Sequence, residues 1–286
     1  MRASFEVIAS GFQFVEAPRV DDDGTVYFSD LTGGGYYRCK PGFQVDTVLP
    51  ARMWIGGAVL DRSGSILLGG KGGIVRVNPA TGESNPVLRE IDGVPIVAVN
   101  DMEANSQGGI FGGTIDFGAV FERGETPSGG QLFYLSSAGE VRILREGLVA
   151  SNGMGFSPDG RRLYHSESTQ GIWIYSLGDD GMPGAPEMFA RIEDSDGLVV
   201  DSDGGVWVAC WQRAEVRRYR PDGVLDRRIT LPFPHIVSLS FGGPELTDLY
   251  VATGGNAEHP GKGGIVRIKS EVPGLRAFKS GWATWT

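Results

Sequence analysis

The stretch DSDGGVWVAC at residues 201–210 decides the fold of this chain, because it joins a turn ending in glycine to a short apolar strand. Related stretches occur at five other places: DDDGTVYFSD (21–30), DRSGSILLGG (61–70), ANSQGGIFGG (104–113), SPDGRRLYHS (157–166) and, with an altered turn, LTDLYVATGG (246–255). The five regular turn glycines are 40, 44, 52 and 44 residues apart along the sequence. A period of about 40 to 50 residues with four strands per unit indicates the blades of a β-propeller.

A second strand pattern follows most of these stretches. It reads GGIVRVNP (72–79), GGQLFYLS (129–136), QGIWIYSL (170–177), AEVRRYRP (214–221) and GGIVRIKS (263–270). Runs of β-branched and aromatic residues between Gly, Pro and Asp are typical of strands, and no long segment has the apolar period of a helix. Because the glycine-turn unit occurs six times, we predict an all-β protein. Residues 1–286 should form one six-bladed β-propeller domain, with four-stranded blades around a central channel.

The composition is that of a globular protein with many tight turns. Glycine accounts for 45 of the 286 residues, roughly twice its average usage of about 7%. The net charge of -9 is spread along the chain, so nucleic acid is not an expected partner. Cys39 and Cys210 have no CxxC spacing, which argues against a disulfide framework or a thiolate zinc site. No segment approaches the ~18 apolar residues of a membrane span, and we expect a cytoplasmic protein that does not bind membranes.

The first residues of the inner strands are the candidate functional residues, because in a propeller these strands line one channel and begin at one rim. Counting back eight residues from the regular turn glycines gives Glu16, Gly56, Asn100, Asn152 and Asp196. The sixth turn is irregular, and its strand pattern places Ile236 or His235 at the same level. Two carboxylates and two amides are therefore predicted to form one polar ring.

A cation would explain why two carboxylates share an apolar channel, since each would otherwise be buried beside a like charge. All four polar residues offer oxygen, which favours Ca²⁺ as the one divalent cation, with Mg²⁺ or Mn²⁺ next. Zn²⁺, which more often recruits His or Cys, and Fe²⁺ are not excluded. The alternative is that these side chains only cap the strand ends by hydrogen bonding to neighbouring main-chain amides.

At these residues the sequence resembles the SMP-30/gluconolactonase/luciferin-regenerating-enzyme family of six-bladed propellers. The matching segments are VEAP around Glu16, ND at Asn100, SNGMGFSPDG around Asn152 and DGLVVDSDGGVWVAC from Asp196. The resemblance covers essentially the whole chain. It implies that Glu16, Asn152 and Asp196 bind the metal, and that Asn100 adds a fourth ligand or holds the substrate. It also implies hydrolysis, most often of lactones and in some relatives of organophosphates.

The sequence departs from the pattern of the sugar-lactone hydrolases in this family at two positions. Ala98 stands where they commonly have an arginine, and Phe117 and Gly118 stand where they tend to have an acidic residue. A guanidinium and a carboxylate suit sugar hydroxyls. The rim is predicted to gain apolar groups in their place, from Trp54, Met102, Phe117 and Phe121. We therefore expect a small-molecule substrate less polar than an aldonolactone, unless these residues only pack the loops.

The expected reaction is the attack of water on a lactone carbonyl whose oxygen binds the cation. Asp196 is the candidate base for that water, unless a water held jointly by metal and Asp196 is the effective nucleophile. Asn100 and His235 are the other candidate catalytic residues, with His235 as acid, base or hydrogen-bond donor. No GxSxG motif occurs and Ser151 has no evident partner, so a serine nucleophile is not expected.

Two other functions remain open at the level of sequence. A metal-dependent phosphotriesterase or arylesterase would use the same cation and an apolar pocket. A propeller that binds a small molecule or a protein, with a purely structural cation, would not be an enzyme. The sequence gives no indication of the oligomeric state.

Overall fold

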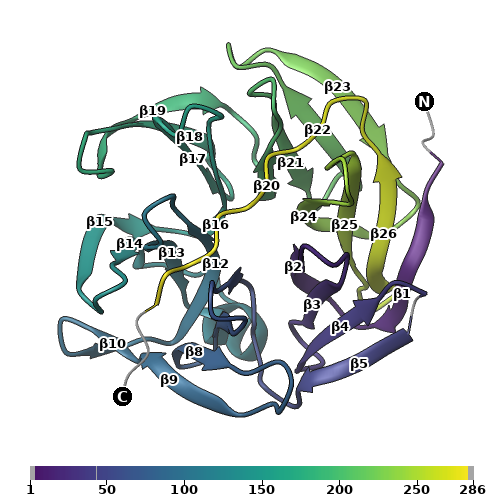
Figure 1. Ribbon diagram of the computed structural model, residues 1–286, viewed down its shortest axis with the longest axis horizontal. Helices are drawn as coiled ribbons and strands as arrows, with labels where there is room; N and C mark the ends of the chain where they lie inside the picture. The colour runs from purple at the N-terminus through teal and green to yellow at the C-terminus, as the bar shows by residue number, and fades with distance from the viewer. Residues whose placement is uncertain (1–3, 43, 283–286) are drawn as a thin grey trace.

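The computed structural model describes residues 4–42 and 44–282 and is nearly all β. Six four-stranded antiparallel sheets stand around a central axis as the blades of a propeller (Figure 1). The predicted six-bladed β-propeller with four strands per blade is therefore confirmed.

In five blades the chain runs outward from the axis through four consecutive strands. The first blade contains β2 (Val15–Val20), β3 (Val26–Asp30), β4 (Tyr36–Lys40) and β5 (Gln44–Leu49). The second contains β6 (Ala58–Leu60), β7 (Ile66–Gly70), β8 (Gly73–Val77) and β9 (Ser84–Leu88). The third contains β12 (Ala98–Ala104), β13 (Ile110–Ile115), β14 (Gly130–Leu135) and β15 (Val141–Leu148). The fourth contains β16 (Ser151–Phe156), β17 (Arg162–Glu167), β18 (Gly171–Leu177) and β19 (Pro183–Ala190). The fifth contains β20 (Ser195–Val200), β21 (Val206–Cys210), β22 (Glu215–Tyr219) and β23 (Leu225–Thr230).

The sixth blade closes the ring with strands from both ends of the chain. It contains β24 (His235–Gly242), β25 (Asp248–Gly254), β26 (Gly263–Lys269) and, outermost, β1 (Glu6–Phe12). Because β1 pairs with β26, the first strand of the chain ties the last blade to the first. The connections of the second and third blades add a small hairpin, β10 (Glu90–Ile91) with β11 (Val94–Pro95), and a π-helical turn, η1 (Ala119–Arg123).

The strands near the axis are buried on both faces because neighbouring blades cover them. Every residue of β3 and of β21 is buried, whereas the outer strand β23 alternates between half-buried and exposed residues. A strand covered on both sides has a continuous apolar sequence, and a strand with one wet face alternates. Trp207, for example, packs with Leu239 and Val251 between the fifth and sixth blades.

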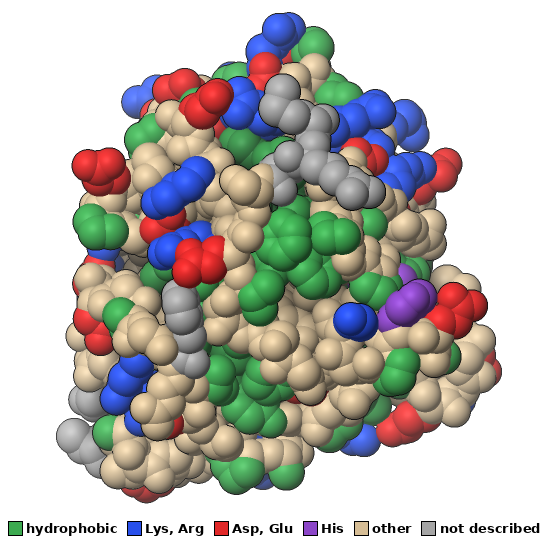
Figure 2. Space-filling view, turned by 90° about the vertical axis from the view of Figure 1, so that its right-hand side faces the viewer, with side chains coloured by type: hydrophobic (Ala, Val, Ile, Leu, Met, Phe, Trp, Pro, Cys, Tyr) green, Lys and Arg blue, Asp and Glu red, His purple; other side chains and the backbone are tan. Residues whose placement is uncertain are grey.

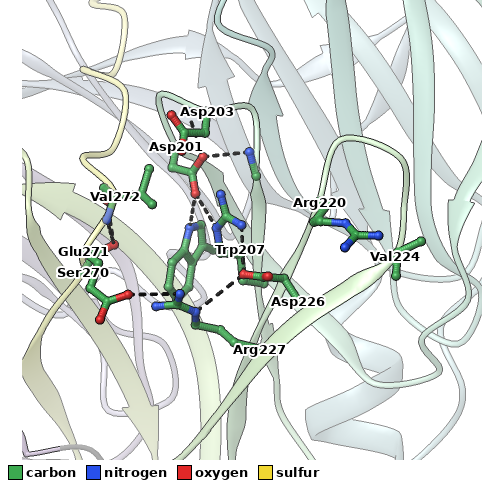
Figure 3. A network of polar contacts seen from close by, with 12 residues as sticks. Asp201, Asp203, Trp207, Arg220, Val224, Asp226, Arg227, Ser270, Glu271 and Val272 are labelled. Atoms are coloured by element: carbon green, nitrogen blue, oxygen red, sulfur yellow. Dashed lines mark hydrogen bonds and ion pairs between the residues drawn. The ribbon is translucent and has the colours of Figure 1, made fainter.

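Asp201, the first residue of the repeated turn, stabilises the turn through its side-chain carboxylate. Asp201 Oδ1 accepts a hydrogen bond from the main-chain nitrogen of Gly205 at 2.7 Å. Its Oδ2 accepts from Trp207 Nε1 and Arg218 Nε, both at 2.7 Å, and Figure 3 shows the carboxylate beside the Trp207 ring. Gly204 has a φ of 77°, which favours glycine at this place. The Asp-x-Asp-Gly signature is thus an Asx-type turn that also anchors the following strand.

The segment 271–282 crosses the end of the channel at which the inner strands finish, and Figure 1 shows it running over the middle of the ring. Ser280 Oγ donates to Asp61 Oδ2 at 2.6 Å, and the main-chain nitrogen of Trp282 donates to the same oxygen at 3.1 Å. The Trp282 side chain is buried among core residues of the second and third blades. These contacts fix the segment across one mouth of the channel.

The outer surface carries charges of both signs. In the side view of Figure 2, Lys and Arg side chains are interspersed with Asp and Glu around a middle where hydrophobic side chains gather. Some of these charges pair, as Arg220 does with Asp222, although exposed pairs of this kind contribute little stability. Among the described residues, no helix is both long and apolar enough to cross a bilayer.

Candidate metal centre and active site

Four polar residues stand at the beginning of four inner strands, and we call them the ring residues: Glu16 on β2, Asn100 on β12, Asn152 on β16 and Asp196 on β20. Each lies at a shift in the pairing between the first and second strand of its blade, where one extra residue is inserted. Such β-bulges re-aim side chains and are frequent next to active sites. The bulges therefore change where these side chains point relative to a regular strand.

Glycines bring the inner strands together at this level. A Cβ atom on Gly153 would collide with the main chain of Gly197 and Leu198, and one on Gly197 would lie 2.5 Å from Ser238 Oγ. The residue before each of these glycines is a ring residue, Asn152 or Asp196. Neighbouring blades can thus approach main chain to main chain beside the ring, which places the ring side chains close to one axis.

Glu16 and Asp196 are both buried and have no positive partner. Burial raises the pKa of Glu16 well above its ordinary value, and the charges of Asp196 and Asp101 raise it further. The pKa of Asp196 is also raised, first by burial and then by the charges of Asp101 and Asp194. Within the described residues neither carboxylate has a basic side chain within ion-pair distance. The ring therefore holds negative charge that the protein itself does not neutralise.

Asn152 is held in one orientation from both sides. Its Oδ1 accepts a hydrogen bond of 2.7 Å from Asn100 Nδ2, and its Nδ2 donates to Ser168 Oγ, also at 2.7 Å. Ser168 in turn donates to the main-chain oxygen of Ser195 at 2.6 Å. A carbonyl oxygen has two lone pairs, so Asn152 Oδ1 keeps one acceptor position besides the one that Asn100 uses.

Asp101 belongs to this group of residues, although the spacing argument does not select it. It is buried, it raises the pKa of both Glu16 and Asp196, and its Oδ1 accepts from the main-chain nitrogen of Met102 at 2.8 Å. In a regular strand successive side chains face opposite sides, so spacing assigns only Asn100 to the channel. The bulge after Val99 brings Asp101 close to the same carboxylates. In the sequence, the signal for this was the pair of adjacent polar residues, Asn100 and Asp101, near the start of an inner strand.

The donor set fits a hard cation better than a soft one. Glu16, Asn152 and Asp196 offer only oxygen, the ligand that Ca²⁺ and Mg²⁺ prefer. The charge of two unpaired carboxylates equals that of one divalent cation. Among the described residues no group of three His, Cys, Asp or Glu side chains could hold a metal, so the amide of Asn152 is needed to complete three protein ligands.

The sixth blade also has a bulge at this level, between Ile236 and Ser238. Ser238 lies beside Gly197 of the fifth blade, because a Cβ atom on that glycine would be 2.5 Å from Ser238 Oγ. Ile236, one of the two residues predicted at this level, is fully buried in the core.

His235 is the first residue of β24 and lies among rim aromatics. Its Nδ1 is 2.9 Å from the main-chain oxygen of Trp211, and its ring lies 5.3 Å from that of Trp211 and 5.9 Å from that of Phe14. A carbonyl only accepts, so Nδ1 carries the proton in this contact. In the neutral ring Nε2 is then an acceptor.

The residues predicted to give an apolar rim differ in exposure: Phe121 is exposed, whereas Trp54, Phe117 and Met102 are buried. Trp54 and Phe117 share one core cluster with Ala98 and Ile115. Trp54 and Phe117 pack with their ring centroids 6.2 Å apart, and Phe121, which is 43% exposed, lies 5.3 Å from Phe117. Lys71 Nζ sits 4.0 Å from the centre of the Trp54 ring. Met102 is fully buried in the core between the second and third blades, because after the bulge it returns to regular pairing with Gly112.

Ser151 does have a partner, contrary to the sequence prediction. Its Oγ lies 2.8 Å from His165 Nε2, on the neighbouring strand of the same blade. Both side chains are fully buried, and burial followed by the charge of Arg145 lowers the pKa of His165 to about 3. A nucleophile must reach its substrate, so this sealed pair is not a catalytic serine and histidine.

Two cavities lie at the opposite end of the channel from the ring. The larger, of about 380 Å³, is lined by the turn 21–24, by residues 241–244 and by 276–279 of the crossing segment. The smaller, of about 140 Å³, lies beneath the same segment. Arg19 and Glu103 line both of them. None of the four ring residues lines either cavity.

Comparison with known proteins identifies the family of this chain. Residues 14–255 match the model of the SMP-30/Gluconolactonase/LRE-like region. Pentonolactonase XacC of Haloferax volcanii is 31% identical over 82% of this chain and 79% of its own, and 6-deoxy-6-sulfogluconolactonase of Pseudomonas putida is 27% identical over 87% and 88%. The crystal structure of a calcium-binding protein, regucalcin, from Agrobacterium tumefaciens has a TM-score of 0.87 at 21% identity and covers 99% of both chains. The chain belongs to the SMP-30/gluconolactonase/LRE-like family.

Proposed function

We propose that this protein is a lactonase that depends on one divalent cation bound by Glu16, Asn152 and Asp196. The observation that carries the proposal is the buried pair of carboxylates, Glu16 and Asp196, which has no positive partner among the described residues. Two relatives, a pentonolactonase and a sulfogluconolactonase, support lactone hydrolysis. Ca²⁺ is the preferred cation because all three ligands are oxygens.

A bound cation would supply Lewis-acid polarisation of the lactone carbonyl. Asp196 takes the proton from the attacking water, because a carboxylate next to the reacting centre can act as general base. Its carboxylate is buried at the start of β20. Glu16, which shares this environment, remains a ligand.

Asn100 mainly holds Asn152 in this proposal. Both hydrogens of its amide nitrogen are used, one by Asn152 Oδ1 at 2.7 Å and one by the main-chain oxygen of Ser151 at 2.8 Å. Only Asn100 Oδ1 is left to accept a hydrogen bond from a substrate hydroxyl. A substrate-binding role for Asn100 is therefore limited to that oxygen, which faces Gly56.

The substrate is an apolar-substituted lactone, less polar than a sugar lactone. Its apolar part would contact the exposed ring of Phe121, which packs on the buried rings of Phe117 and Trp54. The nearby acid Asp116 is occupied, because it pairs with Arg123 at 2.7 Å and accepts from the main-chain nitrogen of Ala119 at 2.9 Å. From the sixth blade, His235 Nε2 would act as a base or hydrogen-bond acceptor when the ring is neutral, and as an acid or hydrogen-bond donor when the ring is protonated.

A cytoplasmic location is part of this proposal. Cys39 and Cys210 are free and buried, and burial raises the pKa of both thiols. Reduced, unpaired cysteines are usual in the cytosol.

The test combines metal analysis of the purified protein with turnover of a lactone panel before and after chelation. Sugar lactones, alkyl-substituted lactones, phenyl esters and paraoxon-like triesters form its four arms. The expected result is one divalent cation per chain, loss of lactone turnover on chelation and recovery on adding Ca²⁺. Faster turnover of esters or triesters would replace the lactonase by an arylesterase or phosphotriesterase. Metal binding with no turnover in any arm would leave a binding propeller with a structural cation.

A further inference from the structure

Arg19 lies in the channel directly below the ring, three residues after Glu16 on β2. Its side chain is 9% exposed, and its NH2 nitrogen donates to the main-chain oxygen of Met102 at 2.6 Å. The same nitrogen lies 3.3 Å from Glu103 Oε2 and 3.6 Å from Asp101 Oδ1. Arg19 thus reaches from the first blade to the third and lines both lower cavities.

The charges in this part of the channel divide into two groups. Asp101 and Glu103 share the guanidinium of Arg19, whereas Glu16 and Asp196 have no ion-pair partner among the described residues. Asp101 is the link between the groups, since its charge acts on Glu16 and on Asp196 as well as on Arg19. When all are ionised, four carboxylates and one guanidinium leave three negative charges in excess, two on Glu16 and Asp196 and one shared by Asp101 and Glu103.

We propose that Arg19 is a positioning residue that neutralises Asp101 and so sets the cation site to hold one divalent ion. This inference rests on the proposed function, because it concerns the same cation. Without the guanidinium, the unpaired charge of Asp101 would be added to that of Glu16 and Asp196. The site would then attract cations more strongly, and trivalent ions would gain most because Coulomb energy scales with ionic charge.

The alternative is that Arg19 only fills space and donates to main-chain oxygens. It donates through NH1 to Pro18 at 2.8 Å as well as to Met102, and a neutral amide can also donate. Arg19→Gln therefore keeps a hydrogen-bond donor and removes the charge, whereas Arg19→Lys keeps the charge. A structural role predicts equal or weaker cation binding in both variants, and the charge role predicts tighter binding in Arg19→Gln alone.

The experiment measures Ca²⁺ binding by calorimetry and Tb³⁺ binding by luminescence at pH 8 on the full-length protein. For Arg19→Gln we expect Ca²⁺ to bind about tenfold and Tb³⁺ about thirtyfold more tightly than to wild type, so that selectivity for Tb³⁺ rises about threefold. Arg19→Lys should stay within about twofold of wild type. Arg218→Gln is the matched control, because Arg218 is equally buried but pairs with Asp201 and Asp226 on the fifth blade.

The outcomes separate this inference from the proposed function. If the wild-type protein bound neither ion, the metal-dependent function itself would fail. Should wild type bind Ca²⁺ while Arg19→Gln binds it equally or more weakly, only the role of Arg19 is refuted. If Arg19→Gln does not fold, Glu103→Gln decides instead. Without the Glu103 carboxylate, the Arg19 guanidinium would pair with Asp101 alone, and Ca²⁺ binding should weaken about threefold. Unchanged Ca²⁺ binding would refute the proposal.

Discussion

Asn100 donates its side-chain amide to Asn152 Oδ1 at 2.7 Å, although the two residues are 52 positions apart and stand on different blades. Each lies at the start of its inner strand, at a bulge. The contact joins the third and fourth blades at the ring. It also orients the amide of Asn152, whose other end is fixed by Ser168.

The first prediction concerns the hydrogen bond that Asn152 donates to Ser168. Ser168→Ala should weaken Ca²⁺ binding about tenfold, because groups that orient a metal ligand typically contribute a factor of 10 to 100. Calorimetry of the purified variant measures it. Ser166→Ala is the control, since Ser166 is buried two residues before Ser168, on β17, and its Oγ has no hydrogen-bond partner in the described chain. Equal effects of the two substitutions would mean that Ser168 does not position Asn152.

Asp196→Asn should reduce kcat for lactones by about 10³, the middle of the range for general acid-base groups. Without cation the variant should be more stable than wild type above neutral pH. The reason is that Asp196 has a raised pKa, so the folded state loses stability as pH rises through that pKa, whereas asparagine does not ionise. Thermal unfolding with and without Ca²⁺ measures this, and Asp222→Asn on an exposed turn is the control. A variant with full turnover would exclude Asp196 as the base.

Glu103→Gln should flatten the pH dependence of stability. Burial raises the pKa of Glu103 from 4.5 to about 7, with the charge of Arg19 opposing the shift. A carboxyl with a raised folded pKa favours folding fully below its unfolded pKa, and this contribution is lost as pH rises from about 4.5 to about 7. Urea unfolding at several pH values should show the difference. Glu122→Gln, at a more exposed position, should leave the curve unchanged; a similar change there would point to a general charge effect.

Phe121→Ser should raise KM for alkyl-substituted lactones about fivefold with little change in kcat, because an exposed ring that contacts substrate contributes about 1 kcal/mol. Phe278→Ser is the matched control, since Phe278 is 39% exposed but lies at the lower end of the channel. Steady-state kinetics on a series of alkyl chain lengths is the measurement. An unchanged KM over the series would remove Phe121 from the substrate side of the rim.

Met102→Ala should destabilise the protein by about 2–5 kcal/mol, as expected for a large side chain removed from a packed core. KM for the same lactones should not change, because Met102 packs with Val59 and Phe133 and not with the rim. Denaturant unfolding and kinetics on the folded fraction test both parts. A raised KM at unchanged stability would indicate that Met102 contacts the substrate.

The order of turns and strands was predictable from sequence because each is a local property. A glycine at positive φ, such as Gly204, and an Asx turn, such as that of Asp201, are set by a few neighbouring residues. Their period counts the blades. Because the rise per residue of a strand is nearly constant, counting a fixed number of residues back from each turn glycine reaches Glu16 and Asp196.

Contacts between residues on different blades could not be predicted in this way. The bulge beside Asn100 changes the two-residue period that places Asp101 and Met102, and one inserted residue reverses the side on which a side chain is expected. The bulge between Ile236 and Ser238 on the sixth blade is likewise not visible in the sequence pattern. No local pattern indicates that Arg19 reaches the third blade.

The sequence by itself determined the number of blades, the strand order and the set of oxygen-bearing residues at the strand starts, because these follow from short-range turn chemistry and a regular period. Only the tertiary structure decided which charges meet. Closure of the ring through β1 and β26 brings strands from distant parts of the chain to one axis. Electrostatic energy depends on distances through space, and the sequence order does not contain those distances.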